Sequence, residues 1–226
     1  RYASLRTSAG LRRVVGYTEA SRGCKHLCRH CPVVPVYRGR FRIVSPQVVL
    51  ADIRNQVEDG ARHITFGDPD FFNGIRHAMS VVEGLNREHP DISYDVTIKI
   101  EHLLTYADCL HKLRETGCLF VTSAVESLDD KALLALDKGH TRADFEKAVH
   151  LCGDAELALA PTFIAFTPWT TLKSYCELLE AIATLGLIDA VSPIQLGIRL
   201  LITSESRLLT LPEIKSLIGP YDSERL

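Results

Sequence analysis

Apolar positions along the chain follow two spacings. Short apolar runs of about 4–6 residues, rich in β-branched and aromatic side chains, are typical of buried strands. They predict strands at residues 13–17, 63–66, 94–98, 119–123, 159–163 and 191–196. Longer stretches repeat their apolar residues every three or four positions and predict helices at 47–59, 73–88, 103–116, 129–136, 142–152, 171–185 and 211–218.

The order of these elements is six β units, each followed by α structure. Such alternation favours an α/β fold with a parallel sheet and right-handed crossovers. A closed eight-fold barrel usually needs about 250 residues, and this chain has 226. Six units fit either an open doubly wound sheet or a curved partial barrel. With no visible linker or repeat, we expect a single domain over 1–226.

Composition narrows the choice of partners. Lys and Arg number 26 against 28 Asp and Glu, a formal net charge of −2, so no nucleic-acid partner is indicated. The longest apolar run, 157–166, contains Pro161 and is too short for a membrane span. The chain opens on Arg1 without a signal-peptide pattern. We expect a cytoplasmic protein whose C-terminal extension has been shortened.

The seven cysteines fall into two groups. Four are scattered on apolar stretches and are expected to be small buried hydrophobes in a reducing environment: Cys109, Cys118, Cys152 and Cys176. Three are crowded after the first predicted strand, in a C-x3-C-x2-C spacing: Cys24, Cys28 and Cys31. Three thiolates leave one position open on an iron–sulfur cubane, whereas His26 or His30 could complete a tetrahedral zinc site.

Polar residues follow the other predicted strands. They are Gly67 and Asp68 after the second, Lys99 after the third, Ser123 and Glu126 at the fourth, the stretch 165–170 after the fifth, and Gln195 and Arg199 at the sixth. Because parallel strands end on the same side of a sheet, these residues are expected to line one pocket. Such a pocket suits a zwitterionic ligand carrying a ribose.

In its cysteine motif and in the polar residues that follow its predicted strands, the chain resembles the radical S-adenosylmethionine (radical SAM) superfamily over about 13–201. The resemblance rests on Cys24, Cys28 and Cys31 after the first strand of a six-fold β/α chain. It implies a (βα)6 partial TIM-type barrel, a [4Fe–4S] cluster on the three thiolates, and SAM chelated at the fourth iron. It further implies an electron donor such as flavodoxin or ferredoxin, and a small-molecule substrate attacked by a carbon radical.

The resemblance also suggests individual roles. Gly67-Asp68-Pro69 stands where the family has a Gly-Gly-Glu type motif for the SAM ammonium, and His30 where an aromatic residue usually precedes the third cysteine. It implies that the SAM carboxylate, ribose and adenine contact Lys99, Ser123, Glu126, Ile164 and Phe166. Gln195, Arg199 and Trp169 are candidates for substrate contacts.

Three alternatives stay open at this point. The run 65–170 also resembles a bacterial radical SAM group with a cysteine- or selenocysteine-containing C-terminal tail, which this chain does not show. Cleavage of SAM could yield a 5′-deoxyadenosyl radical, or a 3-amino-3-carboxypropyl group transferred to a heteroatom acceptor, as in arsenical natural-product biosynthesis. The non-enzymatic alternative is a zinc-stabilised binding protein.

Overall fold

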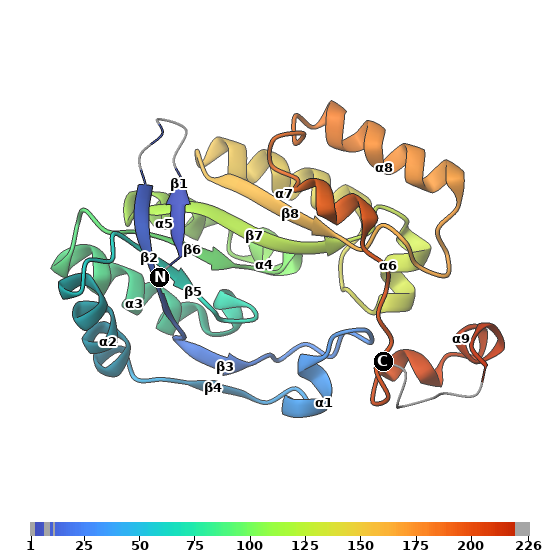
Figure 1. Cartoon of the computed structure of the whole chain (residues 1–226), viewed down its shortest axis with the longest axis horizontal. Coiled ribbons are helices and arrows are strands. Elements are labelled where there is room, and N and C mark those ends of the chain that lie inside the picture. Colours follow the sequence, from blue (N-terminus) through green and yellow to red (C-terminus); the bar gives the residue numbers. More distant parts are fainter. Residues whose placement is uncertain (1–2, 7–9, 11, 220–226) are drawn as a thin grey trace.

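A six-stranded, mostly parallel sheet organises the molecule (Figure 1). This computed structural model describes residues 3–6, 10 and 12–219. The strand order is β1-β2-β5-β6-β7-β8, with bounds Ser4–Arg6, Arg12–Thr18, His63–Phe66, Ser93–Thr97, Cys118–Glu126 and Ala158–Phe163. Strands β2, β5, β6, β7 and β8 pair in parallel, and β1 adds to β2 antiparallel.

A small hairpin lies outside this sheet. Strands β3 (Ser21–Gly23) and β4 (Phe41–Ile43) pair antiparallel, and helix α1 (Val33–Tyr37) lies in the connection between them. Along the lower edge of Figure 1, β3, β4 and α1 form one group. This segment carries the three clustered cysteines.

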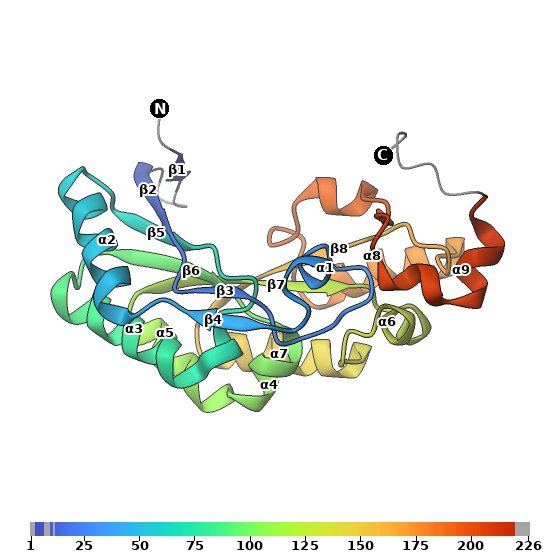
Figure 2. The same ribbon diagram turned by 90° about the horizontal axis from the view of Figure 1, so that it is seen from below.

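Helices flank the sheet. They are α2 (Pro46–Glu58), α3 (Ile75–Glu88), α4 (Ile100–Thr105), α5 (Leu110–Glu115), α6 (Asp130–Leu136), α7 (Arg142–Asp154), α8 (Leu172–Thr184) and α9 (Pro212–Leu217). Figure 2 shows α3, α4, α5 and α7 running along the same side of the strands. The hairpin lies along the edge of the sheet, at the bottom of Figure 1.

Local signals in the sequence explain where the helices begin. Pro46 occupies the first turn of α2, where its missing N–H would have no partner in any case. Thr141 forms a capping box with Asp144 at α7, and Thr171 forms one with Ser174 at α8. These caps satisfy backbone N–H groups that the first helical turn leaves free.

The curled sheet confirms the expected partial barrel, but one predicted strand is wrong. Residues 191–196 are not a strand, because Pro193–Gly197 forms a 3-10 turn. Pro193 lies in the first turn of this 3-10 helix, where its missing N–H needs no partner. Only an isolated parallel bridge, Phe166 with Arg199, extends the sheet beyond β8.

Two smaller expectations also need correction. The predicted helix 103–116 is divided into α4 and α5 by a 3-10 turn at Ala107–Cys109. Cys118 and Cys152 are buried as expected, whereas Cys109 is half-buried and Cys176 is exposed. Cys176 lies on the solvent side of the amphipathic helix α8, so its apolar sequence neighbours misled the expectation. No helix in the described ranges is both long and apolar enough to cross a membrane.

The core lies between the sheet and its helices. Phe163 of β8 is 1% exposed, and its ring packs edge-on against Phe145 of α7, with ring centroids 6.0 Å apart. This contact fixes α7 against the end of the sheet that leads into the candidate site.

We therefore expect Phe163→Ala to lower the free energy of unfolding by about 3–5 kcal/mol, since it removes a buried ring and leaves a cavity. Urea denaturation of the purified chain measures this loss. Leu172→Ala is the matched control, because Leu172 is 82% exposed and its loss should cost less than about 0.5 kcal/mol. Equal losses in both variants would contradict the assigned packing.

Candidate functional site

Three free thiols line one cavity beside the ends of the parallel strands. Cys24, Cys28 and Cys31 lie on the loop between β3 and α1. The cavity measures about 100 Å³, and its wall also includes Lys99, Glu126 and Lys138 among other residues. The loop therefore brings together the cysteines that the sequence singled out, together with both signs of charge.

The spacing of the thiols bears on which metal group they fit. A tetrahedral zinc with bonds of about 2.3 Å holds its ligand sulfurs about 3.8 Å apart. Within the described residues, the three sulfurs do not fall within 4.8 Å of one another, nor do two of them with a histidine of the loop. In a [4Fe–4S] cubane each thiolate binds a different iron, so the three sulfurs lie farther apart than around one zinc. The cubane therefore fits this arrangement better.

Arg29 fastens the middle of the cysteine loop to the end of helix α6. Its backbone N–H donates to the carbonyl of Leu136 at 2.9 Å. Its guanidinium donates to the carbonyls of Leu134 and Ala135 at 3.0 and 2.9 Å. The last carbonyls of a helix have no partner within the helix, so Arg29 satisfies these groups and holds the loop in place.

A late segment of the chain lies against the same loop. The Ser206 hydroxyl donates to the carbonyl of Arg29 at 3.0 Å, and the Arg207 guanidinium donates to the carbonyl of Leu27. At the start of the loop, Lys25 donates from its backbone to Asn73 Oδ1 at 3.3 Å. The loop is thus anchored to three distant parts of the sequence.

Glu126 forms the centre of a buried charged group at the end of β7. A bulge there gives Glu126 a φ of 72°, a left-handed conformation that is uncommon outside glycine. Its Oε1 lies 3.0 Å from His30 Nε2 and 3.3 Å from Lys138 Nζ. Burial acts to raise the pKa of Glu126, but the His30 hydrogen bond and the Lys138 charge outweigh it and lower the pKa. Glu126 is therefore ionised at neutral pH.

A second charged group surrounds Asp70. Its Oδ2 lies 2.7 Å from His102 Nδ1 and 3.5 Å from His26 Nε2. Lys99 Nζ lies 3.0 Å from both His26 Nδ1 and Glu101 Oε2. Two histidines and a carboxylate can bind a cation. However, the Lys99 ammonium occupies His26 Nδ1, and His26 Nε2 lies 3.5 Å from Asp70 Oδ2 as a charge contact.

Several candidate residues use their side chains for local structure. Asp68 accepts from the Ala20 N–H at 2.9 Å and from the Ser21 hydroxyl, so it faces the turn after β2. Ser123 is fully buried and donates to the carbonyl of Ile98 at 2.6 Å. Gly67 lies under the ring of Tyr17, where any side chain would collide with it. Their expected SAM contacts stay predictions that rest on the backbone at these positions.

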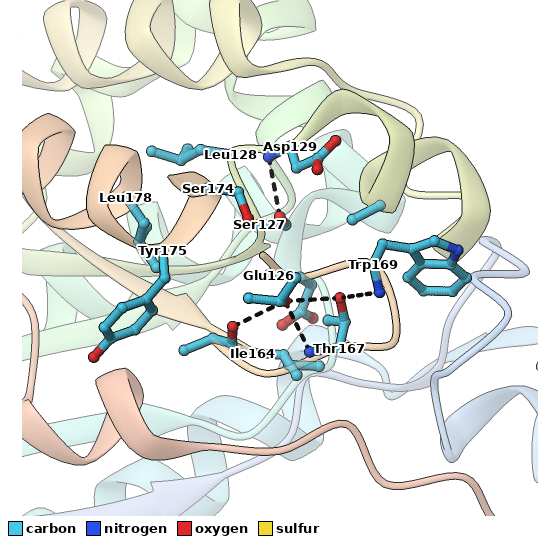
Figure 3. A pocket seen from close by; sticks show the side chains of 13 residues that line it. Glu126, Ser127, Leu128, Asp129, Ile164, Thr167, Trp169, Ser174, Tyr175 and Leu178 are labelled. Atoms are coloured by element: carbon cyan, nitrogen blue, oxygen red, sulfur yellow. Dashed lines mark hydrogen bonds between the residues drawn. The ribbon is translucent and has the colours of Figure 1, made fainter. Parts of the chain in front are cut away.

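A second, smaller cavity shares Glu126 with the first (Figure 3). Ile164 and Trp169 line it, and the Ile164 N–H donates to the Glu126 carbonyl at 2.8 Å. Phe166 is half exposed and stacks on Tyr175, with ring centroids 5.3 Å apart. The apolar residues expected near an adenine therefore lie on the segment beside Glu126.

The substrate candidates lie farther out on the C-terminal side. Gln195 accepts from the Phe163 N–H at 3.2 Å and is half-buried. Arg199 is exposed and pairs through its backbone with Phe166. The structure does not bring either one into the cysteine cavity.

Three functional residues were missed from the sequence: Arg29, Asp70 and Lys138. The signal for Asp70 was its place just after a buried strand, two residues beyond Asp68. Lys138 follows the left-handed Asp137 that ends α6, so its direction depends on a turn. Arg29 gave no signal, because its partners lie more than a hundred residues away.

With this geometry established, comparisons place the chain in a family. The Radical SAM superfamily model matches residues 18–191. The chain therefore belongs to the radical SAM superfamily, whose [4Fe–4S] cluster and SAM are the cofactors that the three thiols and the cavity suit. The zinc-stabilised binding protein is not supported.

Curated relatives and solved structures agree with this assignment. The chain is 25% identical over 207 residues to a tRNA-2-methylthio-N(6)-dimethylallyladenosine synthase of Jannaschia sp. (strain CCS1), covering 85% of this chain and 44% of the relative. It is 25% identical over 174 residues to the ribosomal protein uS12 methylthiotransferase RimO of Syntrophotalea carbinolica, covering 72% and 38%. The chain thus spans less than half the length of these relatives.

The fold matches two solved enzymes. The cobalamin-dependent S-adenosylmethionine radical enzyme OxsB aligns with a TM-score of 0.71 at 16% identity, over 96% of this chain and 41% of that one. The radical S-adenosylmethionine methyltransferase TsrM from Kitasatospora setae aligns with a TM-score of 0.63 at 20% identity, over 77% and 33%. At these identities the likeness concerns the fold alone.

We expect Arg29→Ala to lower the free energy of unfolding by about 1–2 kcal/mol, because it leaves helix carbonyls without partners. Urea denaturation checks this value. Arg54→Ala serves as the control: Arg54 pairs with Glu88 on the surface, and such pairs contribute less than about 1 kcal/mol. A loss at Arg29 no larger than at Arg54 would argue against the anchor.

The pH dependence of stability tests the Asp70 group. Burial acts to raise the pKa of Asp70, but His102 and His26 outweigh it and lower the pKa from 3.8 to about 2. A lowered pKa in the folded state stabilises the fold above the unfolded pKa, and this contribution is lost as the pH falls from about 4 to about 2.

Wild type should therefore be more stable than Asp70→Asn by about 2 kcal/mol at neutral pH, with the difference shrinking below about pH 4. Urea denaturation of both proteins between pH 3 and 7 measures it. A difference that stays constant over this range would show that Asp70 gains nothing from its histidines.

Proposed function

We propose that this chain reductively cleaves SAM to a 5′-deoxyadenosyl radical that acts on a small-molecule substrate. One observation carries the proposal. Three free thiols lie on a single cavity with two lysines, Lys99 and Lys138, in a chain that matches the radical SAM family over 18–191. A redox cluster with one iron that no cysteine binds suits this cavity better than a single metal ion does.

When bound, the cluster supplies one electron that breaks a carbon–sulfur bond of SAM. The chain's own residues hold and orient the reactants. Cys24, Cys28 and Cys31 are the proposed cluster ligands, while Arg29 keeps their loop against α6. Because Cys28 is buried and Cys24 and Cys31 are half-buried, the loop limits the access of water to the metal.

We further propose that the charged groups of the cavity receive the polar ends of SAM. Lys99 and Lys138 offer ammonium groups to its carboxylate. Each lysine is buried beside the cavity and pairs with its own carboxylate, Glu101 or Glu126, which the SAM carboxylate can replace. Glu126, with His30 behind it, offers an acceptor to the ribose hydroxyls or the ammonium. Ile164 and Phe166 would pack on the adenine, while Gly67 and Asp68 contribute backbone groups.

The observations that bear on the substrate, and on which carbon–sulfur bond of SAM breaks, are less specific. Trp169, Gln195 and Arg199 lie on the C-terminal side and are proposed to contact the substrate. Transfer of a 3-amino-3-carboxypropyl group to a heteroatom acceptor, including an arsenical, is the alternative outcome of SAM cleavage. Membership in the group with a cysteine- or selenocysteine-containing tail, and a cytoplasmic location, stay predictions.

The test uses anaerobically reconstituted protein. We expect about four irons and four sulfides per chain, and an electron paramagnetic resonance signal of the reduced cluster that changes when SAM is added. Product analysis then separates 5′-deoxyadenosine from methylthioadenosine, which would instead indicate transfer of the aminocarboxypropyl group. Zinc without iron, or no response to SAM, would overturn the proposal.

Variants localise the cluster. Cys24→Ala, Cys28→Ala and Cys31→Ala should each abolish the four-iron cluster and SAM cleavage. Cys176→Ala is the matched control, because this thiol is exposed on α8 outside the cavity. Retention of the cluster and of SAM cleavage in any of the three site variants would remove that cysteine from the proposed ligands.

A further inference from the structure

The segment that carries the cysteines has an unusual charge. Residues 20–51 contain six cationic residues and no Asp or Glu: Arg22, Lys25, Arg29, Arg38, Arg40 and Arg42. Removing these six leaves 20 cationic residues against 28 acidic ones elsewhere, so the rest of the chain has a net charge of −8. Positive charge is thus concentrated around the cysteine loop of an otherwise acidic protein.

The cationic residues are brought together by the hairpin and α1. Strand β3 pairs with β4, so that Arg22 lies directly opposite Arg42. The Lys25 ammonium lies 5.2 Å from the centre of the Phe41 ring of β4. Arg38 ends α1, and the backbone of Arg40 donates to the carbonyl of Tyr37 at 2.8 Å. Figure 1 shows these elements together on one side of the molecule.

Several of these charges have no partner of opposite sign. Arg22 is paired with Glu19 at 2.6 Å, and Arg29 lies 4.0 Å from Asp137. Arg38, Arg40 and Arg42 are exposed and form no ion pair with any residue that the structure describes. Like charges directly opposite on paired strands destabilise a hairpin, so the Arg22–Arg42 arrangement costs stability that folding alone does not require.

Exposed apolar side chains are mixed with these cations. Leu27, between Cys24 and Cys28, is 44% exposed, and Val36 of α1 is 72% exposed. Arginine together with exposed apolar side chains is typical of protein–protein interfaces. We call this surface the basic face, defined by Arg38, Arg40 and Arg42 with Leu27 and Val36.

We propose that the basic face is the docking surface for an acidic one-electron donor protein of the flavodoxin or ferredoxin type. This inference rests on the proposed function, since the donor serves the cluster held by the same loop. One electron leaves the reduced donor and enters the oxidised cluster, and no atom is transferred. The mixture of apolar residues and the position on the cysteine loop favour a donor protein over a nucleic acid.

The test compares two ways of reducing the holoenzyme. In Arg38→Glu/Arg40→Glu/Arg42→Glu, the concentration of reduced flavodoxin that gives half-maximal SAM cleavage should rise at least ten-fold, since charge complementarity steers encounter. With dithionite as reductant, the rate should match wild type within about two-fold, since these residues are outside the cavity. The control reverses cations distant from the basic face, Lys112→Glu/Lys173→Glu, and should leave both rates unchanged.

Salt dependence and a milder variant distinguish an effect of charge from an effect of misfolding. For wild type, raising ionic strength from about 0.05 to 0.5 M should slow the flavodoxin-driven rate and leave the dithionite-driven rate nearly unchanged. Arg38→Gln/Arg40→Gln/Arg42→Gln should flatten this dependence without introducing negative charge. Melting temperatures and iron content of each variant confirm that the fold and cluster are retained.

The outcomes separate the two proposals. No SAM cleavage with dithionite in wild type would overturn the proposed function itself. Cleavage with dithionite, but a flavodoxin-driven rate that ignores both salt and charge reversal, would overturn only the docking surface. Loss of bulk tRNA binding in the charge-reversed variant, with an unchanged flavodoxin-driven rate, would assign the basic face to nucleic acid and also overturn it.

Discussion

A loop without regular structure has to hold three thiols around a cavity, and the rest of the site depends on how that loop is fastened. Arg29 does most of this by satisfying the carbonyls at the end of α6. A helix end left without partners in a protein interior is costly. The loop and the helix end therefore stabilise each other.

The second constraint is that the buried charges around the cavity must balance. Lys99 and Lys138 are each almost fully buried, and their partners are Glu101 and Glu126. Buried ions of this kind are stable only when they are paired and hydrogen-bonded. Because every lysine contact in the cavity is to a side chain, a zwitterionic ligand can replace the partners without disturbing the sheet.

The sequence alone predicted the parts of this protein that depend on local pattern. Five parallel strands followed from apolar spacing and strand order, and the C-x3-C-x2-C motif singled out the three cysteines. Apolar spacing left a doubly wound sheet equally open, and the partial barrel was implied only by the resemblance to the radical SAM superfamily. The expected strand at 191–196 was wrong because the apolar pattern does not show that Pro193 begins a 3-10 turn there. Arg29 and Lys138 were missed because their roles depend on contacts made only after the chain has folded.

The anchors of the cysteine loop join segments that are far apart in the sequence. Arg29 and Leu134 are separated by 105 residues, Arg29 and Ser206 by 177, and Leu27 and Arg207 by 180. During ribosomal synthesis, the cysteines emerge long before their anchoring residues. The loop can therefore make all of its anchoring hydrogen bonds only after the region around residue 207 has left the ribosome.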